Sequence, residues 1–432
     1  MRVSFYTLGC KVNQNETGAL QRLFEQNGYL LAAPGESADV YVVNSCTVTN
    51  FGDQKSRKWL RRAKRENPGA VTVLTGCYPQ AFPEEAAAIA EADVVTGTGS
   101  RHRILADVAK VLDGTEPRVV DIQPHAKGEK FEELPLEKFE DHTRAFIKIE
   151  DGCDRRCAYC VIPRARGPVR SRDEASILAE LHALAAAGYK EVVVSGISLP
   201  SYGKDNGSCL LDILEKIDTV PGIERVRLGS LDPDMLKPSD IQRLAGLSRL
   251  CPQFHLSLQS GCTATLRRMR RPYTAEQYAR VVEDLRTAFA PRLISFTTDV
   301  IVGFPGETEQ DFLQSMAFVE QIGFLKVHVF PYSRRSGTPA ADFPDQLTEQ
   351  EKAARSHRMT AAAEAVRAKV AAGMQGVTAP VLLETALSAT TFTAYTPQYL
   401  PVAVQAPGHS CGEIVQVTIG EWDGNRAKAT LV

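Results

Sequence analysis

Three cysteines lie close together near the middle of the chain, in the run GCDRRCAYC. Cys153, Cys157 and Cys160 have the spacing C-x3-C-x2-C. A structural zinc site takes four Cys or His ligands, whereas three thiolates on a [4Fe–4S] cube leave one iron open. An open iron can chelate an amine and a carboxylate, such as those of S-adenosylmethionine. The spacing therefore predicts a cluster that passes an electron to this cofactor's sulfonium and releases a 5′-deoxyadenosyl radical, rather than a zinc knuckle.

A second set of three cysteines follows short β-rich runs near the start of the chain. Cys10, Cys46 and Cys77 close the runs RVSFYTLGC, DVYVVNSC and AVTVLTGC. The carboxyl ends of parallel strands share one edge of a sheet, where ligands bind, so these residues can meet at one site. A free cysteine is often only a small buried side chain. Three at matching strand ends favour a second [4Fe–4S] cluster, whose open iron could carry sulfide or methylsulfide.

The order of the expected elements divides the chain into three parts and a linker. Residues 1–120 alternate apolar runs with helical stretches, which predicts an open parallel α/β sheet that holds the second cluster. Residues 121–140 are charged and lack periodicity, so we expect a linker. Residues 141–373 resume the β/α alternation, which predicts a partial TIM-type (β/α)6 barrel with its chemistry at the strand C-terminal ends. Residues 374–432 are typical of a small antiparallel β-barrel of a kind that often binds nucleic acid.

Several element boundaries can be read directly. Ser171 and Glu174 have capping-box spacing before a helix that we expect to end at Gly188. Thr348 and Glu351 have the same spacing at the start of the last long helix. The six apolar runs expected as barrel strands are 146–149, 192–194, 226–228, 254–258, 298–304 and 326–330.

The charge of the chain is nearly balanced but unevenly distributed. Its net charge of −2 argues against a general polyanion binder. Basic residues nevertheless gather in three groups, which suggests local positive surfaces for phosphate, although each group alone fits a solvated face equally well. The groups are Lys55, Arg57, Lys58, Arg61, Arg62, Lys64 and Arg65; Arg164, Arg166, Arg170 and Arg172; and Arg267, Arg268, Arg270 and Arg271.

The chain shows neither a secretory signal nor a run of apolar residues long enough to span a bilayer. We therefore expect a cytoplasmic protein without a membrane partner. In that compartment its ten cysteines would stay reduced, so no disulfide framework is expected.

The cysteine triplet on the first strand of a β/α barrel resembles the radical S-adenosylmethionine superfamily. The resemblance implies that Tyr159 lies against the adenine of the cofactor. The alternatives are ordinary packing for Tyr159, a plain tight turn for Gly196 and strand-end caps for Gln259 and Ser260. Further cofactor contacts are expected from turns at the ends of later strands, at Gly196, Gln259, Ser260, Gly303 and Pro305.

Motifs along essentially the whole chain resemble the methylthiotransferase family, including a C-terminal module similar to the TRAM domain. Within the family they are most similar to the branch that acts on threonylcarbamoyladenosine in tRNA. The isopentenyladenosine branch typically reads GCQMN and NTCAIRE, and the branch acting on a ribosomal-protein aspartate reads GCPKN. The motifs are GCKVNQNE, NSCTVTNFGDQKSR, TGCYPQ, KIEDGCDRRCAYCVIPRARGP, QSGCTATLRRMRRPY, DVIVGFPGET and VFPYSRRSGTPA.

The resemblance implies a reaction that uses S-adenosylmethionine twice. One molecule methylates sulfur associated with the cluster of Cys10, Cys46 and Cys77. A second is cleaved at the cluster of Cys153, Cys157 and Cys160, and the radical removes hydrogen from C2 of the adenosine, where methylsulfide is joined. The substrate would be the modified adenosine at position 37, in the tRNA anticodon loop. The partners implied are tRNA and a low-potential electron donor such as flavodoxin or ferredoxin; zinc is not expected.

Three other functions share parts of this pattern. The same chemistry could act on isopentenyladenosine or on a ribosomal-protein aspartate, and the chain could be a non-catalytic iron–sulfur RNA-binding protein. The GCKVN and SRRSGTPA patterns and the basic segment 55–65 weigh against a protein substrate, and the open iron weighs against a non-catalytic role. In the C-terminal module, Phe392, Tyr395 and Tyr399 are candidates to stack on bases, or to form the barrel core.

Overall fold

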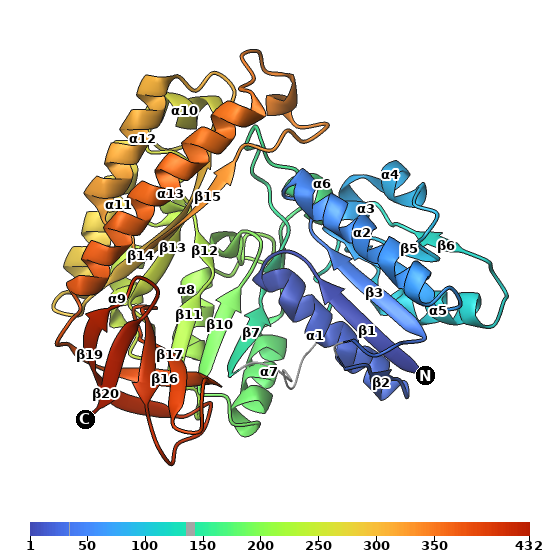
Figure 1. Cartoon of the computed structure of the whole chain (residues 1–432), viewed down its shortest axis with the longest axis horizontal. Coiled ribbons are helices and arrows are strands. Elements are labelled where there is room, and N and C mark those ends of the chain that lie inside the picture. Colours follow the sequence, from blue (N-terminus) through green and yellow to red (C-terminus); the bar gives the residue numbers. More distant parts are fainter. Residues whose placement is uncertain (34, 135–142) are drawn as a thin grey trace.

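The strands of the chain form three sheet systems that follow one another along the sequence (Figure 1). The computed structural model describes residues 1–33, 35–134 and 143–432. An α/β sheet at the N-terminus is followed by a half-open β/α barrel in the centre and a small closed β-barrel at the C-terminus. This arrangement confirms the fold class expected from the order of elements.

Six parallel strands form the N-terminal sheet in the order β2-β1-β3-β4-β5-β6. The register pairs Asn44 with both Thr7 and Thr75, so the three central strands end nearly level with one another. β3 and β4 are buried along their whole length, as expected for parallel strands covered on both faces. The strands are β1 (Arg2–Thr7), β2 (Leu30–Leu31), β3 (Val40–Ser45), β4 (Val71–Gly76), β5 (Val94–Thr96) and β6 (Val119–Asp121), and the helices are α1 (Lys11–Gln26), α2 (Asn50–Glu66), α3 (Cys77–Ala81), α4 (Pro83–Ala87), η1 (Arg101–Arg103) and α5 (Ile104–Leu112).

The central part is a barrel of parallel strands in two hydrogen-bonded sheets, β11-β10-β7 and β12-β13-β14-β15. A parallel bridge between Val226 and Leu250 joins the two sheets. Within the described residues β7 pairs only with β10 and β15 only with β14, so the barrel stays half open. The barrel strands are β7 (Arg144–Lys148), β10 (Glu191–Ser195), β11 (Arg225–Leu228), β12 (Ser230–Leu231), β13 (Gln253–Leu256), β14 (Ser295–Val302) and β15 (Lys326–Pro331). β8 (Glu150–Asp151) and β9 (Arg170–Ser171) form a separate antiparallel pair.

One of the two expected helix starts in the barrel is correct. Thr348 and Glu351 form a capping box at α13, with the Thr348 hydroxyl accepting from the Glu351 N–H. The Ser171–Glu174 box was wrong: Ser171 is in β9, and Asp173 caps α7 instead. The helices are α6 (Ile162–Arg166), α7 (Glu174–Ala186), η2 (Leu199–Ser201), α8 (Leu210–Ile217), η3 (Pro233–Met235), α9 (Pro238–Gly246), α10 (Thr263–Arg268), α11 (Ala275–Phe289), α12 (Glu309–Ile322), η4 (Pro339–Asp342) and α13 (Glu349–Ala372).

The C-terminal part is a closed five-stranded barrel in the order β16-β17-β18-β20-β19. Its core is filled by alternate side chains of each strand, and Phe392 lies within it at 4% exposure. Phe392 is therefore a core residue, as one of the two readings of this aromatic group expected. The strands are β16 (Thr378–Ala386), β17 (Thr391–Tyr395), β18 (Pro401–Gln405), β19 (Ile414–Trp422) and β20 (Ala427–Leu431).

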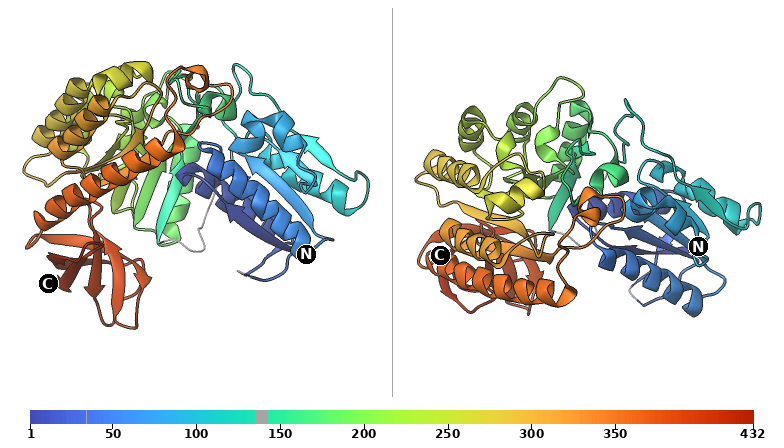
Figure 2. Two further views of the ribbon diagram at one scale, coloured as in Figure 1. Left: turned by 45° about the horizontal axis from the view of Figure 1, so that its top comes forward. Right: turned by 90° about the horizontal axis from the view of Figure 1, so that it is seen from above.

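The three parts contact one another directly. α1 lies against β7, where Asn15 donates a 2.6 Å hydrogen bond to the Phe146 carbonyl (Figure 1). α13 leads from the central barrel to the C-terminal one (Figure 2). Residues 122–134 form no helix or strand and pack near both the N-terminal sheet and the barrel; residues 135–140 of the expected linker lie outside the described residues. Among the helices described, none is long and apolar enough to cross a membrane.

Candidate active site

Cys10, Cys46 and Cys77 lie at the carboxyl ends of three neighbouring strands. Cys46 directly follows β3, Cys77 directly follows β4 and starts α3, and Cys10 follows β1 after two residues and precedes α1. Because β1, β3 and β4 are adjacent and end nearly level, the three side chains share one edge of the sheet. The structure thus brings together a set that is spread over 68 positions of the sequence.

Two glycines allow the close approach of these loops. At Gly9, where φ is +121°, an added Cβ would lie 2.9 Å from Cys46 Cβ. At Gly76, where φ is +99°, it would lie 2.5 Å from the Ser45 carbonyl oxygen. L-residues with a side chain rarely adopt positive φ. Both positions therefore favour glycine because of their backbone conformation and because a side chain would collide with the neighbouring loop. The TLGC and LTGC turns are thereby held against the NSC turn.

Cys153, Cys157 and Cys160 lie in a loop that follows β7 and β8 and ends at α6. Main-chain hydrogen bonds fix the loop at both ends: Cys153 N donates to the Gly167 carbonyl at 3.0 Å, and Cys160 N to the Cys157 carbonyl at 3.1 Å. Nη1 of Arg271 donates to Cys157 Sγ at 3.2 Å. This guanidinium is in turn held by Asp232 and by the Tyr273 hydroxyl.

The two cysteine sets are neighbours in space. α6 starts two residues after Cys160, and Ala165 of this helix packs with Val161, the residue before it, into the same apolar cluster as Cys77. Arg166, at the end of α6, donates from Nε to Cys77 Sγ at 3.2 Å. The loop of one set is thereby fixed against a member of the other.

Each set supplies three thiolates, the ligand type that iron–sulfur clusters take. Among the described residues, no three His, Cys, Asp or Glu side chains are arranged to hold one ion. A [4Fe–4S] cube binds each thiolate to a different iron, so its ligands stand further apart than those of one ion. Burial raises the pKa of the Cys153 thiol to about 11 and those of Cys46 and Cys160 to about 12. Such thiols would be protonated at neutral pH without a metal, whose charge reverses this preference.

A network of buried charges lies between the N-terminal sheet and the barrel. Glu16 of α1 is 2% exposed and accepts from Arg101, Lys148 and Arg166. Asp151, two residues before Cys153, accepts from Lys148 at 2.5 Å and from Arg166 at 3.3 Å. Buried charges are tolerated when they are paired in this way. The network therefore fixes the two cysteine-bearing parts relative to each other.

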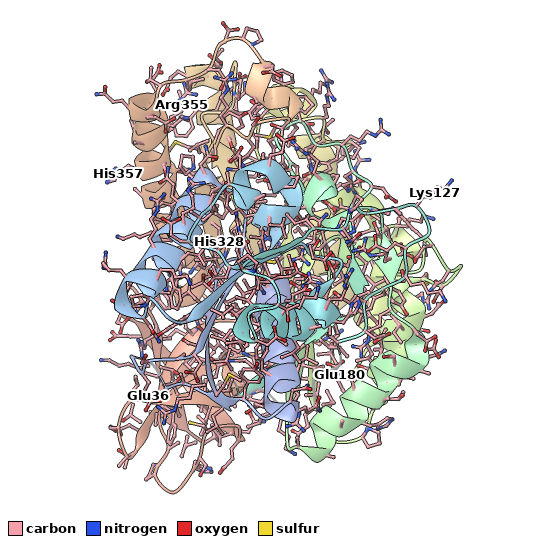
Figure 3. All side chains as sticks on the ribbon, turned by 90° about the vertical axis from the view of Figure 1, so that its right-hand side faces the viewer. Glu36, Lys127, Glu180, His328, Arg355 and His357 are labelled. Carbon is pink, nitrogen blue, oxygen red and sulfur yellow. The ribbon has the colours of Figure 1, made fainter. Side chains whose placement is uncertain are left out.

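A central cavity of about 680 Å³ opens between the N-terminal part, the inside of the barrel and the C-terminal module. Its lining includes Cys10 of the N-terminal part, Ser195 and Gly196 at the end of β10, and Tyr395 and Tyr399 of the C-terminal module. β15 contributes His328, which lies near the middle of the molecule in Figure 3, and Phe330, which is 39% exposed. The cavity can hold a flat organic ring together with a substituent, because pockets of this size bury drug-sized ligands.

The residues expected to touch S-adenosylmethionine lie in different surroundings. Gly196 lines the central cavity, and an added Cβ would lie 2.6 Å from Glu150 Oε2. Tyr159 packs at the edge of a cluster with Phe304. Gln259 has a φ of +70° and pairs with Val300. The last three are in turns after β13 and β14: Ser260 accepts from the Cys262 N–H, Gly303 lies against Lys352, and Pro305 is buried.

The three basic groups differ in exposure and in their ion-pair partners. On α2, Lys55, Lys58 and Arg65 are exposed and pair with no carboxylate among the described residues. The other basic residues of α2 have partners: Arg57 with Tyr78, Arg61 with Glu91, Arg62 with Glu66 and Lys64 with Asp93. In the group 267–271, Arg268 and Arg271 are held by Asp311 and Asp232, and Arg267 and Arg270 are exposed.

The third basic group does not form a phosphate-binding surface, contrary to expectation. Arg166, Arg170 and Arg172 are buried at 0 to 3% exposure, and only Arg164 is exposed. Arg172 pairs with Glu133 and Glu180, and Arg170 lies beside Asp151. These side chains hold the loop after the cysteine triplet rather than a ligand.

Sequence reasoning missed the residues that contact the cysteine sulfurs, Arg166 and Arg271, and the buried carboxylate of Glu150. Glu150 accepts from the Ser198 N–H at 2.7 Å through Oε2, while its Oε1 has no hydrogen-bond partner in the described residues. Burial raises the pKa of this carboxyl well above its usual value. The available signal was the charged pair Glu150–Asp151 directly after an apolar strand, which is unusual unless a partner is near.

Two known families match this chain. Residues 147–319 match the Radical SAM superfamily, and residues 2–97 match the Uncharacterized protein family UPF0004. The first range contains Cys153, Cys157 and Cys160, and the second contains Cys10, Cys46 and Cys77. Each cysteine set therefore belongs to a different family module.

Known proteins resemble the chain along most of its length. A threonylcarbamoyladenosine tRNA methylthiotransferase of Bacillus subtilis is 39% identical over 423 residues, which cover 96% of this chain and 93% of the relative. A tRNA-2-methylthio-N(6)-dimethylallyladenosine synthase of Pelotomaculum thermopropionicum is 34% identical, covering 80% of this chain and 78% of the relative. The radical S-adenosylmethionine methyltransferase TsrM from Kitasatospora setae, solved with cobalamin and a [4Fe–4S] cluster bound, has a TM-score of 0.58 at 15% identity, covering 78% of this chain and 76% of that one; this likeness concerns the fold.

Proposed function

This chain belongs to the methylthiotransferase family of radical S-adenosylmethionine enzymes, and we propose that it adds a methylthio group to C2 of N6-threonylcarbamoyladenosine in tRNA. The relatives with 37 to 40% identity carry the name of that activity. Those named for dimethylallyladenosine are 33 to 35% identical. The enzyme uses two [4Fe–4S] clusters and S-adenosylmethionine.

One observation carries the proposal: two separate sets of three cysteines occupy adjoining loops, which Arg166 joins through its hydrogen bond to Cys77. In our assignment Cys153, Cys157 and Cys160 hold the cluster that cleaves S-adenosylmethionine, and Cys10, Cys46 and Cys77 hold the auxiliary cluster. The bound clusters and S-adenosylmethionine would supply an adenosyl radical and a methylated sulfur. A radical is required because the hydrogen on C2 is unactivated and is not readily removed as a proton. Without the second cysteine set, the enzyme could form the radical but would have no cluster to carry the sulfur.

The remaining side chains position the reactants. The C2 edge of the adenine is proposed to face Cys10, which is exposed and lines the central cavity. Gly196 leaves room at the end of β10 for the cofactor, and Tyr159, Gln259, Ser260, Gly303 and Pro305 are assigned to the same cofactor. Phe330 offers an exposed ring on which a purine can stack.

We assign the substrate nucleoside to position 37, in the tRNA anticodon loop, because a loop base can be turned out of the stack into a cavity. Phosphates of that stem would lie along the basic face of α2, which comprises Lys55, Arg57, Lys58, Arg61, Arg62 and Arg65.

The module 374–432 is assigned as an RNA-binding barrel of the TRAM type, 1–120 as the auxiliary-cluster domain, 121–140 as the linker and 141–373 as the radical domain. The proposed compartment is the cytoplasm.

The reducing electron is proposed to come from a low-potential protein such as flavodoxin or ferredoxin, without zinc at either cysteine set. A cavity of about 790 Å³ beside Cys153 supports this assignment. Its lining includes the exposed side chains of Arg156 and Arg164, so an acidic donor would find complementary charge there.

The proposal is tested by nucleoside mass spectrometry of tRNA from a strain that lacks its own methylthiotransferases and expresses this chain. We expect the 2-methylthio derivative of threonylcarbamoyladenosine with the unaltered chain and none with Cys46→Ala or Cys157→Ala. Cys411→Ser, which changes an exposed cysteine of the C-terminal barrel, is the control and should retain the product. Appearance of methylthio-isopentenyladenosine alone would assign the chain to the other branch, and a modified ribosomal protein with unmodified tRNA would refute the tRNA substrate.

A further inference from the structure

The central cavity is rich in basic side chains. Among the side chains that line it, the only carboxylate in the described part of the chain is Asp299, which lies 3.4 Å from Nε2 of His255. Five basic side chains line the same cavity, so its net charge depends on how many of them are paired with carboxylates outside the lining. The five basic side chains are Lys11, Arg144, Arg227, Lys326 and Arg367.

Three of these cations are already held by protein groups. Arg227 donates to Glu191 at 2.7 Å and to the carbonyls of Thr396 and Pro397 at 2.7 and 2.8 Å. Arg144 pairs with Glu384 at 2.5 Å. Arg367 pairs with Glu364 at 3.3 Å and lies over the ring of Trp422. These three side chains mainly tie the C-terminal module and α13 to the barrel.

Lys11 is different. Among the described residues it makes no hydrogen bond and no ion pair, although it is exposed to the cavity. Arg144 and Arg227 line the same cavity. An ammonium that faces two guanidinium groups without an anion is electrostatically incomplete. A ligand that brings a negative charge would complete it.

Tyr399 lines the same cavity as Lys11 and lies beside Arg144. This ring lies 5.3 Å from the guanidinium carbon of Arg144 and stacks on Tyr395 at 4.6 Å. Burial raises the pKa of the Tyr399 phenol, but Arg144 and Lys11 outweigh burial and the net shift is downward. Tyr399 adopts a φ of +67°, which costs energy in a residue other than glycine and is retained where the surroundings demand it.

We propose that Lys11, together with Arg144 and the Tyr399 hydroxyl, binds the free carboxylate of the threonylcarbamoyl group and so selects this substrate. The inference rests on the proposed function. The substituent on N6 ends in a carboxylate, whereas an isopentenyl group carries no charge. A site built for an anion rejects the neutral analogue, because its cations would stay unpaired and poorly solvated.

The position of Lys11 agrees with the geometry that the reaction needs. N6 and C2 flank N1 on the same edge of the purine, so a group that holds the N6 substituent must be near the site that acts on C2. Lys11 directly follows Cys10, and consecutive Cα atoms are about 3.8 Å apart. An anion bound at Lys11 therefore keeps the C2 edge beside the auxiliary cysteine set.

The inference is tested by binding rather than turnover. Full-length protein with both clusters reconstituted is titrated with anticodon stem-loops that carry threonylcarbamoyladenosine, isopentenyladenosine or unmodified adenosine at position 37. We expect the first RNA to bind about tenfold more tightly than the third, which is the contribution of one charge-assisted contact. Lys11→Gln should remove most of this preference, and Lys11→Arg should retain it.

Lys326→Gln is the matched control, since it removes one positive charge from the same cavity. It should weaken binding of all three RNAs alike. The unmodified RNA reports on the fold of each variant, because its affinity should change little in Lys11→Gln. The inference is overturned if the unaltered protein binds threonylcarbamoyladenosine and adenosine equally, or if Lys326→Gln rather than Lys11→Gln removes the preference. Either result leaves the nucleoside products unaffected, so it is distinct from a failure of the proposed function.

Discussion

Nε of Arg166 lies 3.2 Å from Sγ of Cys77 and donates a hydrogen bond to it, and the same guanidinium binds Glu16 and Asp151. Cys77 belongs to the N-terminal sheet, and Asp151 precedes the barrel triplet by two residues. One fully buried side chain therefore connects the two cysteine sets. Their separation is set by a rigid, charged unit rather than by mobile loops, which suits a reaction in which a radical and a sulfur must meet at one carbon.

Arg166→Gln should weaken retention of the auxiliary cluster. The variant leaves Glu16 with fewer partners in a buried site, and breaking such a network costs about 3–5 kcal/mol. We expect iron to fall from about eight towards four per chain after anaerobic reconstitution, and the cluster-free chain to unfold at a lower temperature. Arg164→Gln, on the exposed side of the same helix, serves as the control and should keep both values. Full iron content in Arg166→Gln would contradict the role given to this contact.

Arg271→Gln should make the barrel cluster harder to reduce. Nη1 of Arg271 donates to Cys157 Sγ, and both the hydrogen bond and the positive charge favour the more negative, reduced state. Loss of about 1.4 kcal/mol of this preference lowers a one-electron potential by about 60 mV. A redox titration followed by electron paramagnetic resonance, in a background with Cys10, Cys46 and Cys77 changed to Ala, measures it. Arg268→Gln, which breaks a pair with Asp311 and a hydrogen bond to Thr265, should leave the potential unchanged.

The stability of the cluster-free chain should fall between about pH 4.5 and pH 2. Burial raises the pKa of Glu16, but Arg101, Arg166 and Lys148 outweigh it and bring the pKa down to about 2 from 4.5. Because the folded-state pKa is the lower one, the stabilisation is complete above pH 4.5 and is lost as the pH falls towards 2. It amounts to about 3 kcal/mol. Chemical unfolding at a series of pH values measures it.

Two variants isolate this contribution. Glu16→Gln should be less stable than the unaltered chain at pH 6 and should lose less stability on acidification. Glu36→Gln changes a surface carboxylate that pairs with Arg2 and is exposed (Figure 3), so its profile should match the unaltered chain. A steep acid limb that persists in Glu16→Gln would assign the effect to other carboxylates.

The elements could be predicted from the sequence because burial leaves a local pattern. All six apolar runs expected in the barrel overlap its strands, and Thr348 caps α13 because the Ser/Thr-x-x-Glu spacing acts within one turn. Ser171 has the same spacing but instead pairs with Glu150 in β9, a contact with a residue 21 positions away. The helix start therefore moved to Asp173. Local signals fail where a partner from another element competes for the same residue.

The site could be predicted only as far as its ligand types. The cysteines at strand ends were visible because topology carries them to one edge. The side chains that contact the sulfurs could not be predicted. Arg166 and Arg271 come close to Cys77 and Cys157 only because α6 and the turn after α10 pack against the cysteine loops. Arg170 and Arg172 resemble surface charges in sequence but are buried in ion pairs, because Asp151 and Glu133 of other segments lie beside them. Ion pairs between different segments leave no pattern in the local sequence.

The exposed face of α2 should supply part of the affinity for tRNA. Lys55, Lys58, Arg62 and Arg65 recur at helical spacing, and Lys58 and Arg65 have no carboxylate partner among the described residues. Each phosphate contact releases counterions, so its loss lowers the slope of log affinity against log salt by about 0.7 to 0.9. We expect Lys58→Gln and Arg65→Gln each to show this change with full-length tRNA. Arg62→Gln removes a charge already paired with Glu66 at 2.8 Å and should change the slope less. Equal slopes in all three variants and the unaltered protein would place the tRNA on another face.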